Sequence, residues 1–205
     1  KIKKNIKPRK ILEIGSNDGS FIKNFNKKNT VGIEPCSNVE RITKLKGYKT
    51  FANYWNKKTA LKILRKFGKF DLIYSANTIS HIKDLDDVFK NINLVLNENG
   101  TLIIEDPSLI ECLKKNTYDQ FYNEHIYVFS YLSLSRIIRK HNLEIFNLEN
   151  IKDHGGSIRY YIKKKQANYK INKSIRIQKK IEIKNGLHKF STYQKFRNRV
   201  ILSRK

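Results

Sequence analysis

The sequence predicts an α/β fold with a mostly parallel sheet of seven strands and helices on both faces. Short apolar runs alternate along the first hundred residues with segments whose apolar residues recur every three to four positions. This alternation is typical of parallel strands joined by right-handed helical crossovers. The chain has 205 residues and is 39% hydrophobic. That composition supports the core of one such domain and excludes a disordered chain.

The first two strands and helices follow from apolar runs and turn residues. Residues 10–14 form an apolar run that ends in a glycine loop, which is typical of a buried strand. Residues 19–25 then place three apolar side chains on one face of a helix, and residues 30–33 form a second short strand. A serine that can cap a helix opens residues 37–45, and a glycine soon follows them.

The same alternation continues to residue 105. Residues 48–51 form the third predicted strand, and residues 57–67 form a helix with leucine and phenylalanine at core spacing. Residues 70–75 are the fourth strand, and residues 85–96 form a helix with three apolar residues facing inward. An Asn-Gly turn then leads into a fifth strand at residues 101–105.

The pattern changes after the fifth strand. Residues 106–129 are rich in Tyr, Phe, Asp and His and show no clean period, so no element is predicted there. Residues 131–141 are expected to form a helix. Residues 144–148 and 157–162 are expected to be the last two strands.

The remaining residues are basic and are expected to be helical at 175–184 and 189–203. We therefore divide the chain into three parts. They are a basic lead-in at residues 1–9, a main domain at residues 10–163 and a basic helical connector or tail at residues 164–205.

The net charge of +25 is concentrated at the two ends of the chain. Residues 1–10 carry six basic residues and no acidic one, and residues 163–205 carry fifteen basic residues and one acidic one. Residues 11–162 carry 22 basic and 17 acidic residues, so the main domain is only mildly basic. Lys, Ile and Asn are frequent throughout, as expected from an AT-rich genome. Nucleic acid is therefore not the expected partner.

No apolar stretch is long enough to cross a membrane, and none resembles a signal peptide. Cys36 and Cys112 cannot make a disulfide scaffold or a four-cysteine zinc site, and we expect both to be reduced thiols. These features predict a cytoplasmic protein without a metal site. The chain has no Met and begins at Lys1, so we expect it to be a piece of a longer product.

The loop after the first strand, residues 13–19 (EIGSNDG), is a candidate cofactor site. A glycine there lets the backbone turn sharply and approach a ligand at the carboxyl edge of the sheet. The dinucleotide fingerprint needs glycines at positions 15, 17 and 20, but Asn17 and Ser20 occupy two of them, which disfavours a pyrophosphate. Glu34 ends the second strand, where a carboxylate can accept hydrogen bonds from both hydroxyls of a ribose. S-adenosylmethionine, with a ribose, no phosphate and a cationic amino-acid end, fits this pattern best.

This loop, together with Gly-Ile-Glu-Pro at residues 32–35, resembles the class I S-adenosylmethionine-dependent methyltransferases, which have a Rossmann-like fold. The resemblance implies that residues 53–55 lie near the adenine. Plain packing is an equal alternative for Tyr54 and Trp55. The implied cofactor-binding residues are Glu13, Gly15, Ser16, Asn17, Asp18, Gly19, Glu34, Pro35, Tyr54, Trp55 and Asn77.

Residues 119–125 (DQFYNEH) bring a phenol, a carboxylate and an imidazole within four positions. This stretch follows the fifth strand, so it can lie over the edge where the methyl donor is expected. Histidine is the commonest general base near neutral pH, and a nearby carboxylate can orient it. A tyrosine hydroxyl can donate to a developing oxyanion. Such a set suits methylation of a carbon next to a ketone, because that carbon becomes nucleophilic only as an enolate.

Four motifs in order sharpen the resemblance. They lie at residues 76–85, 105–107, 121–130 and 154–159, with a weaker echo at residues 192–200. Together they resemble the sugar C-methyltransferases of deoxysugar biosynthesis, which methylate C-3 of nucleotide-linked 4-keto-6-deoxy sugars.

The resemblance implies a role for each motif. His125 is implied as the base that removes the C-3 proton, and Tyr122, Glu124 and His81 share its site. The implied binders of the nucleotide-linked keto sugar are His154, Gly155, Gly156 and Arg159. From the residues alone, His81 can equally be an unused histidine, His154 can belong to a simple turn, and residues 105–106 can cap a helix that begins at Ser108.

The chain departs from this family at both ends. The family's chains usually begin with a four-cysteine zinc domain and continue into a second Rossmann-like domain, which these 205 residues do not supply. Two alternatives therefore stay open: a methyltransferase for another small molecule or RNA, and a truncated cofactor-binding module without activity. RNA is disfavoured because residues 77–80 (NTIS) lack the Pro-Pro-aromatic turn of enzymes that methylate exocyclic base amines.

Overall fold

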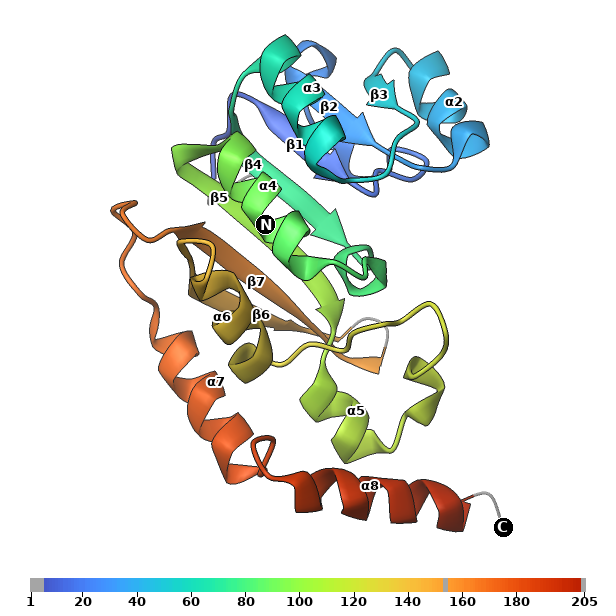
Figure 1. Cartoon of the computed structure of the whole chain (residues 1–205), viewed down its shortest axis with the longest axis vertical. Coiled ribbons are helices and arrows are strands. Elements are labelled where there is room, and N and C mark those ends of the chain that lie inside the picture. The colour runs from blue at the N-terminus through green and yellow to red at the C-terminus, as the bar shows by residue number, and fades with distance from the viewer. Residues whose placement is uncertain (1–5, 153–154, 204–205) are drawn as a thin grey trace.

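The computed structural model describes residues 6–152 and 155–203 (Figure 1). A seven-stranded sheet in the order β3-β2-β1-β4-β5-β7-β6 forms its centre. The first five strands are parallel, and β7 runs antiparallel to both β5 and β6. The predicted α/β fold with a mostly parallel seven-stranded sheet is thus confirmed. The strands are β1 (Ile11–Ile14), β2 (Thr30–Ile33), β3 (Lys49–Phe51), β4 (Phe70–Ala76), β5 (Leu96–Pro107), β6 (Leu143–Ile151) and β7 (Ser157–Lys164).

The helices follow the strands in the expected alternation as far as β5. The α-helices are α2 (Ser37–Leu45), α3 (Lys57–Phe67), α4 (Leu85–Val95), α5 (Leu109–Lys115), α6 (Tyr131–Arg139), α7 (Lys173–Lys184) and α8 (Phe190–Ser203). The described residues also form the short 3₁₀ helices η1 (Ile22–Asn24), η2 (Lys27–Asn29), η3 (Ile79–His81) and η4 (Tyr118–Gln120).

The main hydrophobic core lies between one face of the sheet and the helices α3, α4 and α6, which follow one another along that face in Figure 1. Leu12 and Ile14 project into this core because alternate residues of a strand share a face. A smaller cluster covers the opposite face, where the Phe21 ring stacks on Tyr74 with 3.7 Å between centroids. The carboxyl ends of β1, β2 and β4 form an edge of the sheet that lies between the two hydrophobic clusters.

The prediction of a helix at residues 19–25 is wrong, because only the short 3₁₀ helix η1 forms there. The Asn24 side chain donates hydrogen bonds to the carbonyls of Ser20 and Phe21, and the Asn26 side chain accepts from the backbone of Lys28. Such side-chain contacts with the backbone compete with a continuous helix.

Residues 96–129 also differ from the expectation. β5 has 12 residues and includes the expected turn at residues 99–100, because Leu96 already pairs with Phe70 before a register shift in the ladder. α5 lies in a segment without a clean period, where a helix from Ser108 was considered only as an alternative for residues 105–106. Its Ile110 and Leu113 pack against Leu187 in the C-terminal part of the chain. A contact between segments so far apart cannot be predicted from the local sequence pattern.

The basic C-terminal segment packs closely on the sheet domain. The Glu182 side chain of α7 is fully buried, and its two oxygens accept hydrogen bonds from the backbone N–H groups of Tyr131 (2.8 Å) and Leu132 (2.9 Å). These N–H groups belong to the first turn of α6, which has no partner for them within the helix. A carboxylate is also favourable at the positive end of the helix dipole. The one acidic residue of the tail therefore caps a core helix.

Candidate active site

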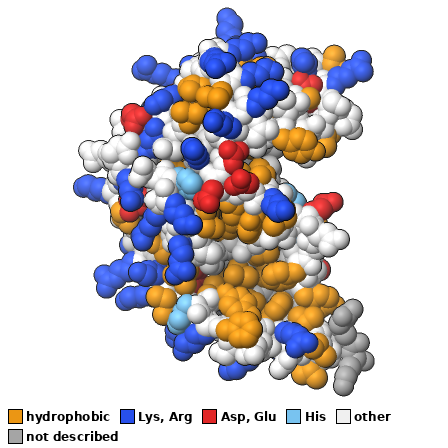
Figure 2. All heavy atoms as spheres, in the orientation of Figure 1, with side chains coloured by type: hydrophobic (Ala, Val, Ile, Leu, Met, Phe, Trp, Pro, Cys, Tyr) orange, Lys and Arg blue, Asp and Glu red, His pale blue; other side chains and the backbone are white. Residues whose placement is uncertain are grey.

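A cavity of about 740 Å³ opens at the carboxyl edge of β1, β2 and β4, where the molecule is visibly hollowed in Figure 2. It is lined by residues of the β1 loop, the end of β2, β4, η3 and the loop before α6. Ten predicted site residues line it: Glu13, Gly15, Ser16, Asn17, Asp18, Glu34, Pro35, Asn77, His81 and Glu124. The structure therefore brings residues from five separate segments to one site.

Gly15 shapes the floor of this cavity. Its φ angle is +75°, and a Cβ atom at this position would lie 2.1 Å from Oγ1 of Thr78. The N–H groups of Gly15 and Ser16 both donate to the Ile33 carbonyl, at 2.8 and 3.0 Å. Only glycine fits a position with this φ angle and this close approach. The turn is tied to the end of β2, beside Glu34.

The Glu34 carboxylate is held in place by two backbone donors. Oε2 accepts from the N–H of Asn17 at 2.9 Å, and Oε1 accepts from the N–H of Cys36 at 3.0 Å. A carboxylate has about four acceptor sites. Each oxygen of Glu34 therefore keeps capacity for a further donor, which matches the two adjacent hydroxyls of a ribose.

Two buried polar atoms beside Glu34 lack a partner in the described part of the chain. Oε2 of Glu13 and Oγ of Ser16 have no hydrogen-bond partner among the described residues. Burial, with smaller contributions from the charges of Asp18 and Glu34, raises the pKa of Glu13 to about 9. A cationic amine placed here would receive the missing interaction and favour the ionised carboxylate. The residues therefore fit both the amino-acid end and the ribose of S-adenosylmethionine.

The predicted catalytic residues gather beside this cavity. The ring centroids of His81 and His125 are 4.7 Å apart. Nδ1 of His125 lies 2.9 Å from the Gln120 carbonyl, and Nε2 lies 3.1 Å from the Tyr122 hydroxyl. A carbonyl can only accept, so Nδ1 carries the proton and the Tyr122 hydroxyl donates to Nε2. Burial lowers the pKa of His81, and the neighbouring His125 lowers it further, which favours a neutral imidazole.

The loop that carries His125 is fastened to η3. The backbone N–H of Tyr127 donates to the Ser80 carbonyl at 3.1 Å, and the Tyr127 hydroxyl donates to the Lys83 carbonyl at 2.8 Å. The Ser80 hydroxyl in turn donates to the buried Asp106 at 2.9 Å. Burial raises the pKa of Asp106 to about 7. This chain of contacts links β5, η3 and the loop that carries His125.

Tyr54, Trp55 and Gly19 do not line the cavity. Trp55 is buried in the main core, where its indole N–H donates to the Val88 carbonyl at 3.4 Å. Tyr54 is 75% exposed. Gly19 has a φ of +81° and shapes the loop from outside the cavity lining. A contact of Tyr54 or Trp55 with an adenine stays a prediction.

The described members of the predicted substrate set, Gly155, Gly156 and Arg159, lie at the beginning of β7. Nε of Arg159 donates to Glu105 at 2.8 Å, and its NH1 lies 3.5 Å from Glu149. Gly155 and Gly156 both have positive φ angles. His154 lies outside the described residues. Glu105 holds Arg159, and Asp106 accepts from Ser80. No side-chain cap is recorded at Ser108, the N-cap of α5, so the capping alternative for residues 105–106 is not seen.

Six further residues line the cavity without having been predicted: Ser20, Phe21, Cys36, Tyr74, Ala76 and Thr78. Tyr74 and Ala76 alternate on β4, so strand periodicity could have found them once the edge was known. Thr78 follows a predicted residue directly. Phe21 was assigned to a helix face, and its place in the lining follows from the loop that forms instead.

Within the described residues, no group of three or more His, Cys, Asp or Glu side chains could hold a metal ion. Across the same residues, no helix has both the length and the apolar character that a membrane span requires.

The sheet order, the Gly15 turn and the acid at the end of β2 define a class I S-adenosylmethionine-dependent methyltransferase domain. Comparison with family models agrees. Residues 2–148 match the model of a methyltransferase domain, and residues 152–205 match the model of a C-methyltransferase C-terminal domain. The chain thus belongs to the methyltransferase family, whose cofactor is S-adenosylmethionine.

The chain also has a curated relative. It is 26% identical over 188 residues to the C-methyltransferase NovU from Streptomyces niveus, an alignment that covers 91% of this chain. The same alignment covers 45% of the relative. The chain therefore spans less than half the length of that protein.

Solved structures show the same fold. An S-adenosylmethionine-dependent methyltransferase from Thermotoga maritima, described as a possible histamine N-methyltransferase, matches with a TM-score of 0.57 and 17% identity over 77% of this chain and 82% of that one. The plantazolicin methyltransferase BamL, in complex with a triazolic desmethylPZN analogue and SAH, matches with a TM-score of 0.58 and 14% identity over 80% of each chain. At these identities the likeness concerns the fold alone.

Proposed function

We propose that this chain carries the catalytic domain for C-methylation next to the ketone of a nucleotide-linked deoxysugar, with His125 as the base that forms the enolate. The observation that carries the proposal is the His125–Tyr122 pair beside the cavity of Glu13 and Glu34. The match of residues 152–205 to a C-methyltransferase domain and the similarity to a C-methyltransferase support it.

Bound S-adenosylmethionine supplies an activated methyl group on its sulfonium. In the proposal, Glu34 accepts hydrogen bonds from the ribose hydroxyls and Glu13 faces the ammonium. The Gly15 turn admits the ligand against the backbone. Fixing donor and acceptor together accounts for much of the rate, because the sulfonium is already a good methyl donor.

His125 takes the C-3 proton on Nε2, and the electron pair of that C–H bond forms the enolate with the neighbouring carbonyl. The Tyr122 hydroxyl, which donates to Nε2 in this structure, can turn to donate to the enolate oxygen instead. The bound cofactor would supply the methyl group to the enolate carbon that His125 generates, and the electron pair of the broken methyl–sulfur bond would leave with S-adenosylhomocysteine. Glu124 and His81 line the same cavity and complete the surroundings of the base.

The assignment of His154, Gly155, Gly156 and Arg159 to the sugar nucleotide stays a prediction. Arg159 already holds Glu105 tightly, while its contact with Glu149 is long at 3.5 Å. In the proposal, a substrate phosphate takes the place of the Glu149 carboxylate beside the Arg159 guanidinium.

Solvent-deuterium exchange at C-3 of a keto-sugar nucleotide tests the proposal, because exchange needs the base and no methyl transfer. His125→Asn should abolish the exchange, whereas His188→Asn, which changes an exposed histidine of the tail, should leave it unchanged. Exchange at the parental rate in His125→Asn would remove this residue from its role. A parent chain that binds the cofactor but never exchanges the proton would favour the alternative of a binding module without activity.

A further inference from the structure

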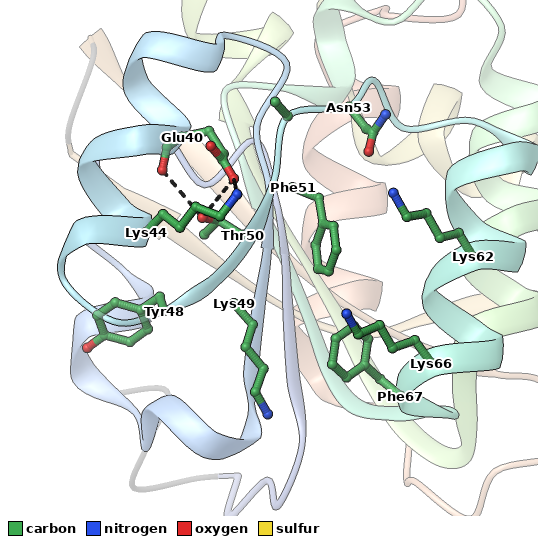
Figure 3. Close-up of a pocket in the computed structure, with 11 residues that line it drawn as sticks. Glu40, Lys44, Tyr48, Lys49, Thr50, Phe51, Asn53, Lys62, Lys66 and Phe67 are labelled. Carbon is green, nitrogen blue, oxygen red and sulfur yellow. Dashed lines mark hydrogen bonds and ion pairs between the residues drawn. The ribbon is translucent and has the colours of Figure 1, made fainter.

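A second cavity, of about 920 Å³, lies along the free edge of β3 between α2 and α3 (Figure 3). We call it the β3 groove. It shares no lining residue with the cofactor cavity. Its volume falls in the range of small-molecule sites, which is roughly 300–1,000 Å³.

Three ammonium groups of the groove have no carboxylate partner among the described residues. No ion pair is found for Lys49, Lys62 or Lys66 within residues 6–152 and 155–203, and Nζ of Lys49 donates to the Lys28 carbonyl at 2.7 Å. The one carboxylate in the lining, Glu40, is already 3.2 Å from Lys44. Lys62 and Lys66 stand four residues apart on α3, a spacing at which like charges repel. The groove therefore carries positive charge that an anion would neutralise.

Two phenyl rings form the apolar part of the groove. The rings of Phe51 and Phe67 lie edge to face with 5.9 Å between centroids. The ammonium groups of Lys62 and Lys66 lie 5.2 and 5.4 Å from the centroid of Phe51, within the range of a cation–π contact. Figure 3 shows both lysines reaching from α3 toward these rings, with the Asn53 amide at one end of the groove.

We propose that the β3 groove binds a nucleoside polyphosphate. The phosphates would lie among Lys49, Lys62 and Lys66, since compact ammonium groups suit phosphate as point charges. The flat base would take the place of the lysine groups on the Phe51 ring, because every base can stack on an aromatic face. Asn53 lines this groove and not the cofactor cavity, where the resemblance had implied it, and it offers both a donor and an acceptor to the edge of the base. This site is separate from the proposed methyl transfer and does not depend on it.

Calorimetric titration of the chain with ATP at physiological ionic strength tests the proposal. The double variant Lys62→Gln/Lys66→Gln should weaken binding by about tenfold or more. Phe51→Leu, which keeps an apolar side chain but removes the ring, should also weaken it. The matched control is Lys57→Gln/Lys58→Gln, which removes the same charge from the same helix outside the groove and should change affinity by less than about twofold.

Further arms separate the parts of the ligand. Adenosine and inorganic tripolyphosphate should each bind more weakly than ATP, and saturation with S-adenosylhomocysteine should leave ATP binding unchanged. The proposal is overturned if ATP does not bind, if the control pair loses as much affinity as the groove pair, or if tripolyphosphate binds as tightly as ATP. Competition with S-adenosylhomocysteine would place the ATP in the cofactor cavity and would likewise overturn it.

Discussion

The Tyr122 hydroxyl lies 3.1 Å from Nε2 of His125, and the opposite nitrogen of the same ring donates to the Gln120 carbonyl. The contact with the carbonyl fixes the tautomer, so Nε2 is the nitrogen with a free electron pair. A phenol and a base nitrogen thus form one unit, four residues long in the sequence.

Tyr122→Phe tests this unit. Loss of the hydroxyl removes the donor for the enolate oxygen, so methyl transfer should fall by about 10²-fold or more while cofactor affinity is retained. Tyr118→Phe is the control, because Tyr118 is similarly exposed in the neighbouring η4. Steady-state methyl transfer and calorimetry with S-adenosylhomocysteine measure the two effects. Equal rates for the Tyr122→Phe variant and the parent chain would separate the hydroxyl from the chemistry.

Glu34→Gln should weaken the binding of S-adenosylhomocysteine. The amide has one acceptor oxygen in place of two, while two backbone N–H groups and two ribose hydroxyls need acceptors. The expected loss is about 1–3 kcal/mol, or roughly 5- to 150-fold in Kd. Glu111→Gln on α5 serves as the control, and thermal unfolding checks that both variants fold. Unchanged affinity in Glu34→Gln would refute the ribose assignment.

The buried Glu13 predicts a specific dependence of stability on pH. Its pKa in the folded chain is about 9, against 4.5 for the ordinary side chain, so the folded state holds a proton that the unfolded state releases between these values. The free energy of unfolding should therefore fall as pH rises through this window, by up to about 1.4 kcal/mol per pH unit from this group. Asp106 acts in the same direction, but only up to about pH 7.

Glu13→Gln should consequently flatten the decline in stability between pH 7 and pH 9, where Asp106 no longer contributes. Urea unfolding of the parent and variant chains at several pH values measures the two slopes. Asp106→Asn is the useful comparison, because it should change the slope below pH 7 and leave it intact above. Parallel curves for the Glu13→Gln variant and the parent chain would show that Glu13 is ionised in the folded state.

α8 is expected to support the loop that carries Tyr122 and His125 from outside. The Phe196 ring lies 5.7 Å from the Phe121 ring, next to Tyr122, and Arg199 ties α8 to the Leu113 carbonyl at 2.6 Å. Phe196→Ala should broaden or shift the His125 ring signals in NMR spectra and lower the rate of methyl transfer, with cofactor affinity unchanged. Phe190→Ala is the matched control, because Phe190 begins the same helix and is 75% exposed. If the His125 ring signals keep their positions and line widths in Phe196→Ala, the proposed role of α8 is contradicted.

The parts of the site that were predictable from the sequence depend on local geometry. Gly15 and Glu34 stand at the ends of neighbouring parallel strands, and any parallel sheet brings such ends to one edge. Residues 122–125 are close in the chain, so their proximity needed no knowledge of the fold. Only the resemblance predicted that His81 lies beside His125. In the structure, the two rings are in contact.

The rest depends on contacts between distant segments. Trp55 follows β3 at a suitable place for a ligand, yet packing against α4 buries it. In the sequence, Glu182 is a single acidic residue in a basic tail. Only the fold shows that its carboxylate caps the first backbone N–H groups of α6. The helix expected around Phe21 does not form, because asparagine side chains make hydrogen bonds with the backbone there. The spacing of apolar residues gives no information about such hydrogen bonds.

A crystal structure of the chain with S-adenosylhomocysteine tests the central claim most directly. We expect both ribose hydroxyls within hydrogen-bond distance of Glu34, the amino group facing Glu13, and the sulfur on the side of the cavity next to His125. A nucleoside bound elsewhere, or a His125 ring turned away from the sulfur, would contradict it.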